Sequence, residues 1–187
     1  MEVTMRKKLT LFICTIIFFF LCLPFPLTAL AGDGYTYIDA NGKTQTTGEL
    51  TVTPIMEDTD TLTTGWYVVD SNVTRSEAIT VSGNVNLILV DSCTLTVTGS
   101  FYNAGINVSA GNSLTVYGQA GGTGTLYAQG APRAAGIGSG DGGTVGTINI
   151  CSGTVTAIGG SGTNHQGILF GSGAGIGGGL FQHKWHN

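Results

Sequence analysis

The sequence predicts an all-β fold in which short strands coil into a solenoid-like sheet. Between about Arg75 and Gly160, apolar segments recur every eight to eleven residues, and Gly, Asn or Ser closes each of them. Most segments alternate apolar residues with Thr, Asn or Ser, the period-2 pattern of a strand with one buried face. No segment carries an apolar stripe at helical spacing together with a cap. Regular short strands that never give way to helices favour a coiled sheet.

The predicted strands follow one another along this part of the chain. They are residues 78–81, 85–90, 94–98, 106–108, 113–117, 124–128, 147–150 and 153–157. If Leu114 and Val116 face the core, the alternation places Tyr117 on the outer surface. Tyr127 lies outward beside Leu126 for the same reason.

Residues 1–31 have the pattern of a signal peptide. Three basic residues at 6–8 precede an apolar run at 9–23, and the small residues at 29–31 place cleavage before Gly32. The run is short for a membrane span of ~20 residues and is followed by prolines, which favours secretion over a retained anchor. We therefore expect an exported chain that is secreted or displayed on the cell surface.

The mature part is long enough for one domain with a buried core. It holds ten acidic and four basic side chains, a net charge of −6, and five of the acids lie between residues 49 and 70. No basic patch remains. This argues against nucleic acid and, after signal cleavage, against a membrane surface as a partner.

Two cysteines, Cys93 and Cys151, remain in the mature part. Export permits a disulfide between them. Both also sit where a strand meets a turn, where small buried thiols are common, so the sequence leaves their redox state open.

Composition divides the mature chain into three segments. Residues 32–77 are polar and acidic, with a turn at Asn41-Gly42, and we predict that they cap the open end of the solenoid. Residues 78–179 form the repeat domain, because Ala-Gly-Ile-Gly at 135–138 returns at 174–177. Residues 180–187 lack both alternation and glycines, so we expect an aberrant tail, with a truncated or shifted reading frame as one explanation.

Several short segments of the sequence resemble those of a known group of proteins. They are Gly-Trp-Tyr-Val-Val at 65–69, residues 85–89 and 106–119, and the Ala-Gly-Ile-Gly repeats. Over about residues 35–179 the chain resembles large secreted surface proteins of gut-type Gram-positive bacteria, mostly uncharacterised and often labelled carbohydrate-binding-domain proteins. The resemblance implies a right-handed parallel β-helix, a pectate-lyase-like solenoid, that serves as a stalk or adhesin-like module. It implies no catalytic residues.

Catalysis is the competing interpretation, because many β-helices cleave polysaccharides with clustered acids on one face. From Ile79 to Gly179 the only acids are Asp91 and Asp141, and the only base is Arg133. A hydrolytic pair needs two carboxylates ~5–9.5 Å apart, whereas Asp is also an ordinary turn residue. We predict no catalytic residue, metal or cofactor. A pocket joining Asp91 or Asp141 to Arg133 would favour the alternative, a polysaccharide lyase or glycoside hydrolase.

The outward tyrosines, Tyr117 and Tyr127, are the candidate glycan contacts. An aromatic face can stack on the apolar face of a hexose, although exposed tyrosine is also simply a favoured strand residue. Alternating threonines at 94–98 and 154–156 also suggest an ice-binding surface. Such a surface needs rows of threonine that stay aligned over several coils. We expect a structural or adhesive, non-catalytic module whose partner is a polysaccharide or a host or cell-wall glycan. The sequence leaves its oligomeric state open.

Overall fold

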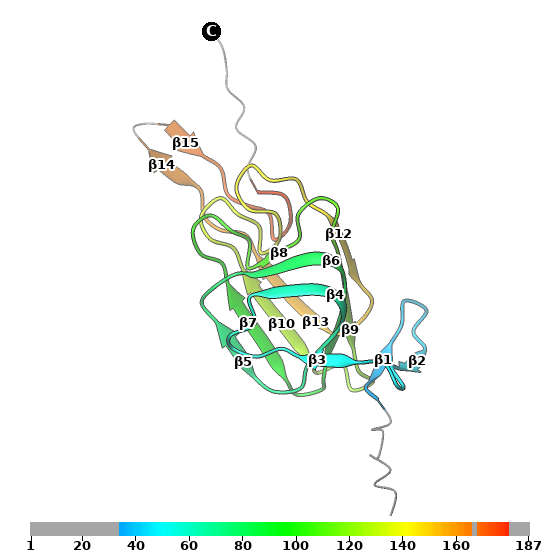
Figure 1. Cartoon of the computed structure of the whole chain (residues 1–187). Helices are drawn as coiled ribbons and strands as arrows, with labels where there is room; N and C mark the ends of the chain where they lie inside the picture. The colour runs from blue at the N-terminus through cyan, green and yellow to red at the C-terminus, as the bar shows by residue number, and fades with distance from the viewer. Residues whose placement is uncertain (1–33, 166–167, 180–187) are drawn as a thin grey trace, which may run out of the picture. The chain divides into compact units, whose positions relative to one another are not determined.

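The computed structural model describes residues 34–165 and 168–179, and these contain strands and turns but no helix (Figure 1). The predicted all-β character is confirmed. The predicted signal peptide and the tail at 180–187 lie outside the described residues. Nothing among the described residues qualifies as a membrane-spanning helix.

Most strands pair in parallel and lie in three stacks. The first stack contains residues 61–63 of β4 (Thr61–Val69), residues 79–82 of β6 (Ile79–Leu89), β8 (Ile106–Asn107), β11 (Ile137–Gly138) and β16 (Ile176–Gly177). The second contains β3 (Val52–Pro54), residues 65–69 of β4, residues 84–89 of β6, β9 (Ser113–Gly118) and β12 (Thr147–Ile150). The third contains β5 (Val73–Arg75), β7 (Thr94–Thr98), β10 (Thr125–Gln129) and β13 (Thr154–Ile158).

The chain visits the three stacks in the same order on each pass. One pass runs through both parts of β6 and then β7, the next through β8, β9 and β10, and a third through β11, β12 and β13. Equivalent residues of successive passes pair directly, as Leu95, Leu126 and Val155 do in the third stack. These parallel sheets are compatible with the predicted coiled sheet.

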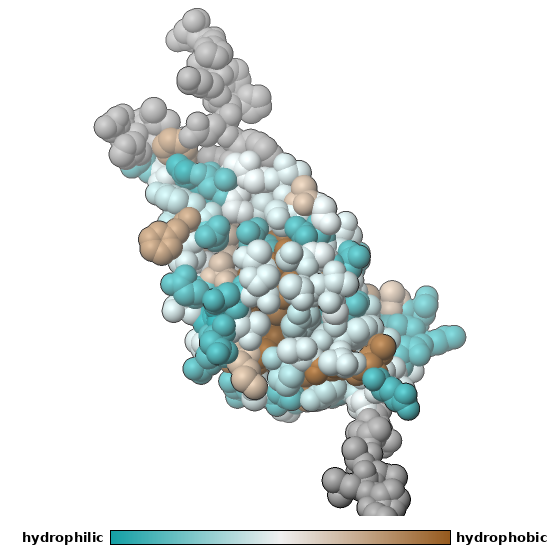
Figure 2. All heavy atoms as spheres, viewed as in Figure 1, coloured by the Kyte–Doolittle hydropathy of each residue, from teal (hydrophilic) through white to brown (hydrophobic). Residues whose placement is uncertain are grey.

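The core is built from columns of inward apolar side chains. In β9 the residues alternate between buried and half-buried positions, with Leu114 and Val116 fully buried. Ile79, Ile106 and Ile137 form one such column and are also fully buried. Each large apolar side chain buried in this way contributes about 1.5–3 kcal/mol. The outward positions are mostly Thr, Asn and Ser, and the face seen in Figure 2 is correspondingly pale or teal over most of its area.

The two strands predicted at 78–81 and 85–90 form one bent strand, β6. Gly83 lies at the bend with φ +97°, and a Cβ there would stand 2.2 Å from the hydroxyl oxygen of Thr64. The Gly83 N–H donates to the Asn112 amide oxygen at 2.7 Å, and the Asn84 N–H donates to Thr64 Oγ1 at 3.1 Å. Glycine and these polar side chains let the strand turn from the first stack into the second.

An antiparallel hairpin, β1 (Thr36–Ile38) and β2 (Thr44–Thr46), lies on the outer side of the second stack. Its turn is the predicted Asn41-Gly42, with Gly42 at φ +74°. The ring of Tyr37 contacts Trp66 and Tyr117, and the Ser152 hydroxyl donates to the Ile38 carbonyl. The rest of the segment 32–77, for which we predicted a cap, contributes β3, β4 and β5 to the parallel sheets. A second hairpin joins β14 (Thr163–His165) to β15 (Ile168–Phe170).

Arg75 occupies an inward position at the first described strand of the third stack, opposite Val97. Its side chain is buried, and its guanidinium donates to the Glu57 carbonyl and pairs with Asp60 at 2.6 Å. A buried charge is tolerated only when it is paired in this way. The segment that holds Glu57 and Asp60 is thereby tied to this end of the core.

Candidate functional site

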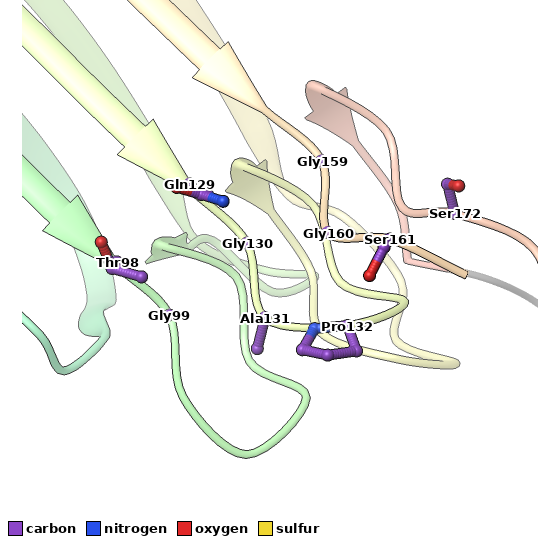
Figure 3. A pocket seen from close by; sticks show the side chains of 10 residues that line it. All are labelled: Thr98, Gly99, Gln129, Gly130, Ala131, Pro132, Gly159, Gly160, Ser161 and Ser172. Atoms are coloured by element: carbon purple, nitrogen blue, oxygen red, sulfur yellow. The ribbon is translucent and has the colours of Figure 1, made fainter. Parts of the chain in front are cut away.

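A groove of about 480 Å³ lies where the strands of the third stack end (Figure 3). Thr98 and Gln129 are the last residues of β7 and β10 and pair with each other, and Gly159 follows the last residue of β13. The groove therefore crosses three successive passes. Its lining residues are Thr98, Gly99, Gln129, Gly130, Ala131, Pro132, Gly159, Gly160, Ser161 and Ser172.

The lining combines hydroxyl and amide groups with small apolar residues, and none of the ten residues is ionisable. Glycine is required in it, since a Cβ on Gly160 would stand 1.7 Å from the Ala131 carbonyl oxygen. Neutral side chains that both donate and accept hydrogen bonds suit a ligand rich in hydroxyl groups.

Tyr127 lies next to this groove. Its side chain is half-buried and faces outward from β10, between its register partners Thr96 and Thr156. Gln129, two residues further on, faces the same side of the sheet and lines the groove, about 7 Å along the strand. The predicted outward orientation of Tyr127 is confirmed, and its register partners on both sides are uncharged threonines.

Tyr117 faces outward as predicted, but from the second stack, so the structure does not bring the two tyrosines together on one stack. Its ring lies 4.8 Å from that of Tyr37 and stacks on Trp66 at 5.5 Å and 19°. Burial, with a smaller effect of Cys151, raises the pKa of the Tyr117 hydroxyl. This aromatic cluster holds the β1–β2 hairpin against the sheet.

The threonine ranks are only partly aligned. Thr94, Thr125 and Thr154 pair in one row across the third stack. In the neighbouring row Tyr127 separates Thr96 from Thr156. The flat, uninterrupted ranks that an ice-binding surface needs are therefore broken at the centre of this stack.

Asp91 is bonded to the backbone of the neighbouring pass. Its carboxylate accepts hydrogen bonds from the N–H groups of Gly121 at 2.9 Å and Thr123 at 3.0 Å, and from the Thr123 hydroxyl at 3.2 Å. These bonds, that from the Thr123 N–H above all, lower the pKa of Asp91. The carboxylate thus joins two turns that lie about 30 residues apart in sequence.

Asp141 pairs with Arg133, two of the residues that a pocket would have to join to favour the enzyme alternative. The guanidinium also lies 4.8 Å from the ring centre of Tyr102 and 4.5 Å from that of Phe170. Neither Arg133 nor Asp141 lines the groove, although Arg133 directly follows Pro132. The pair is largely buried, and its opposite charges neutralise each other.

The two cysteines among the described residues are free thiols. Cys93 and Cys151 are each half-buried, and burial, followed by the charge of Asp39, raises the pKa of the Cys151 thiol. Within residues 34–165 and 168–179, no group of three or more His, Cys, Asp or Glu could hold a metal ion.

The groove residues were not predicted from the sequence. Thr98 and Gln129 fall at or just beyond the ends of predicted strands, and each is followed by glycine. The glycine that follows both Thr98 and Gln129 is the signal in the sequence that could have shown that the two residues occupy equivalent positions. Ser161 precedes β14 and Ser172 follows β15, and each stands between two glycines in Gly-Ser-Gly.

No family model, no curated protein and no solved structure matches this chain.

Proposed function

We propose that the chain is an exported, non-catalytic module that binds a glycan in the groove at the end of the third stack. Its fold is a right-handed parallel β-helix of the pectate-lyase-like kind. After cleavage of the leader before Gly32, the mature chain is secreted or forms part of a cell-surface protein with a structural or adhesive role.

The strand pairing supports a β-helix. Three stacks visited in a fixed order, with inward columns of Ile, Leu and Val, are what successive coils of one solenoid produce. We propose right-handed coiling because connections between parallel strands of one sheet are right-handed in nearly all proteins.

The observation that carries the glycan proposal is the uncharged, hydroxyl-lined groove beside Tyr127. Thr98, Gln129 and the serines offer hydrogen bonds to sugar hydroxyls, and the Tyr127 ring offers a face for a sugar ring. The coil repeat of about 4.8 Å also gives the groove a regular spacing along its length.

We propose that the chain is not catalytic because each candidate carboxylate is already bonded to other groups of the protein. Asp91 holds a turn, and Asp141 is neutralised by Arg133. The second candidate function, a polysaccharide lyase or glycoside hydrolase, has the contact between Asp141 and Arg133 in its favour.

A glycan array probed with residues 32–187, run beside an assay of reducing-sugar release from the bound glycans, tests both functions. We expect binding without release, and loss of binding in Tyr127→Ala and Gln129→Ala. Thr115→Ala changes an outward residue of the second stack and serves as the control. Unchanged binding in both Tyr127→Ala and Gln129→Ala would refute the site. Sugar release abolished by Asp91→Ala or Asp141→Asn would refute the non-catalytic assignment.

A further inference from the structure

The turn that follows β7 displays two aromatic side chains to solvent. Phe101 is 88% exposed and Tyr102 is 50% exposed, although both are large apolar rings. The turn begins at Gly99, which lines the groove, so Phe101 stands two residues from the groove lining. An exposed ring of this size gains nothing from the hydrophobic effect in the isolated chain.

The backbone of this turn is also strained. Phe101 and Tyr102 have φ of +49° and +67°, in the left-handed region that bulky side chains avoid. Among the described residues only two other non-glycine residues have a positive φ, and one of them, Arg133, contacts Tyr102. Residues held in such sparsely populated backbone regions cluster at functional sites.

Arg133 and Asp141, from the connections after β10 and β11, hold this turn in place. The Arg133 guanidinium contacts the rings of Tyr102 and Phe170, and its carboxylate partner Asp141 also donates its backbone N–H to the Tyr102 carbonyl. Arg133 is tied to the groove as well, because its N–H donates to the carbonyl of Ser161. The positive charge is matched by Asp141 and is not free to select an anionic ligand.

On the premise of the glycan-binding function, we propose that Phe101 and Tyr102 form a second sugar-contact surface at the rim of the groove, and that the ligand is an uncharged polysaccharide. The exposed rings stack on the C–H faces of a sugar beyond those held in the groove. A uronate would leave its carboxylate unpaired against a lining without cations, and the net negative charge of the chain would repel it.

The test compares neutral with acidic polysaccharides on residues 32–187, which include the compact unit. Affinity electrophoresis in gels containing laminarin, galactomannan, polygalacturonate or alginate gives the relative affinities. We expect at least one neutral polysaccharide to retard the chain and the two polyuronates to leave it unretarded. Phe101→Gly is expected to weaken binding by up to about tenfold, the value of one aromatic stacking contact.

Phe101→Gly also separates loss of function from loss of folding. Glycine adopts a positive φ without strain, so the unfolding temperature is expected to stay level or rise while binding falls. The control is Leu50→Ala, which removes a 54% exposed side chain outside the groove and its turns. It should leave binding unchanged.

The outcomes that overturn the inference differ from those that overturn the function. Binding of polyuronates in preference to neutral chains, or full binding by Phe101→Gly where Gln129→Ala binds poorly, refutes the inference and leaves the glycan function standing. Absence of binding to every polysaccharide refutes both. An oligomer that Phe101→Gly converts to a monomer, with no change in glycan binding, would assign the exposed ring to a protein contact instead.

Discussion

Leu126 offers a direct test of the stacked core, because one substitution samples three passes of the chain. Its side chain is fully buried between its register partners Leu95 and Val155. Strand pairing on both sides fixes the spacing of the passes, so the sheet has little freedom to close around a missing side chain. Truncation of a buried leucine lowers the free energy of unfolding by about 2–5 kcal/mol, and the cavity accounts for a large part of this loss. We expect Leu126→Ala to lower it by about 3–5 kcal/mol.

The adjacent residue is the matched control. Tyr127 belongs to the same strand but faces outward and is half-buried, so Tyr127→Ala should lower the free energy of unfolding by about 1 kcal/mol. Urea unfolding of both variants, followed by circular dichroism, measures the difference. A shift of one residue in register would exchange the two faces. Equal losses, or a larger loss for Tyr127→Ala, would therefore refute the assigned alternation.

Three further predictions concern the turns and the thiols. Gly83→Ala combines backbone strain with a clash against Thr64 and should lower the free energy of unfolding by about 2 kcal/mol or more. Gly122→Ala, with φ +68° and nothing near its Cβ, should lower it by only about 1 kcal/mol in the same urea titration. Equal losses would show that the clash with Thr64 contributes nothing. Because hydrogen bonds lower the pKa of Asp91 below its usual 3.8, its stabilising contribution is fully present above that value and is lost as the pH falls through the folded pKa. The wild type should thus have a higher melting temperature than Asp91→Asn at pH 6 and lose this advantage as the pH falls from 3.8 through the lowered folded pKa. An advantage independent of pH would contradict it. Because burial raises the pKa of Cys151, iodoacetamide should alkylate it more slowly at pH 8 than a free cysteine, and Asp39→Asn should speed the reaction; rates that match free cysteine would contradict the raised pKa.

The strands were predictable because alternation encodes which side chains face the core. The expected strands at 94–98 and 147–150 coincide with β7 and β12, and that at 113–117 falls within β9. The sequence predicts two strands where the structure has the single bent strand β6, because Gly83 also fits a turn. Local sequence therefore gave the orientation of residues within a strand.

The candidate site was less predictable, because it is made by turns from different passes. Asp91 reads as an ordinary turn residue, and its partners lie 30–32 residues further along the chain. The positive φ of Phe101 and Tyr102 has no counterpart in the composition of that turn. Tyr117 and Tyr127 have the same local pattern, yet only the three-dimensional structure shows that Tyr37 and Trp66 cover one of them.

The measurement that tests the central claim most directly is an amide NMR titration of residues 32–187 with oligosaccharides from the neutral polysaccharide that binds best. We expect the largest shifts at Thr98, Gln129 and Gly160, at the ends of three successive strands of one stack. Shifts confined to the surroundings of Trp66 and Tyr117, or no saturable shift at all, would contradict it.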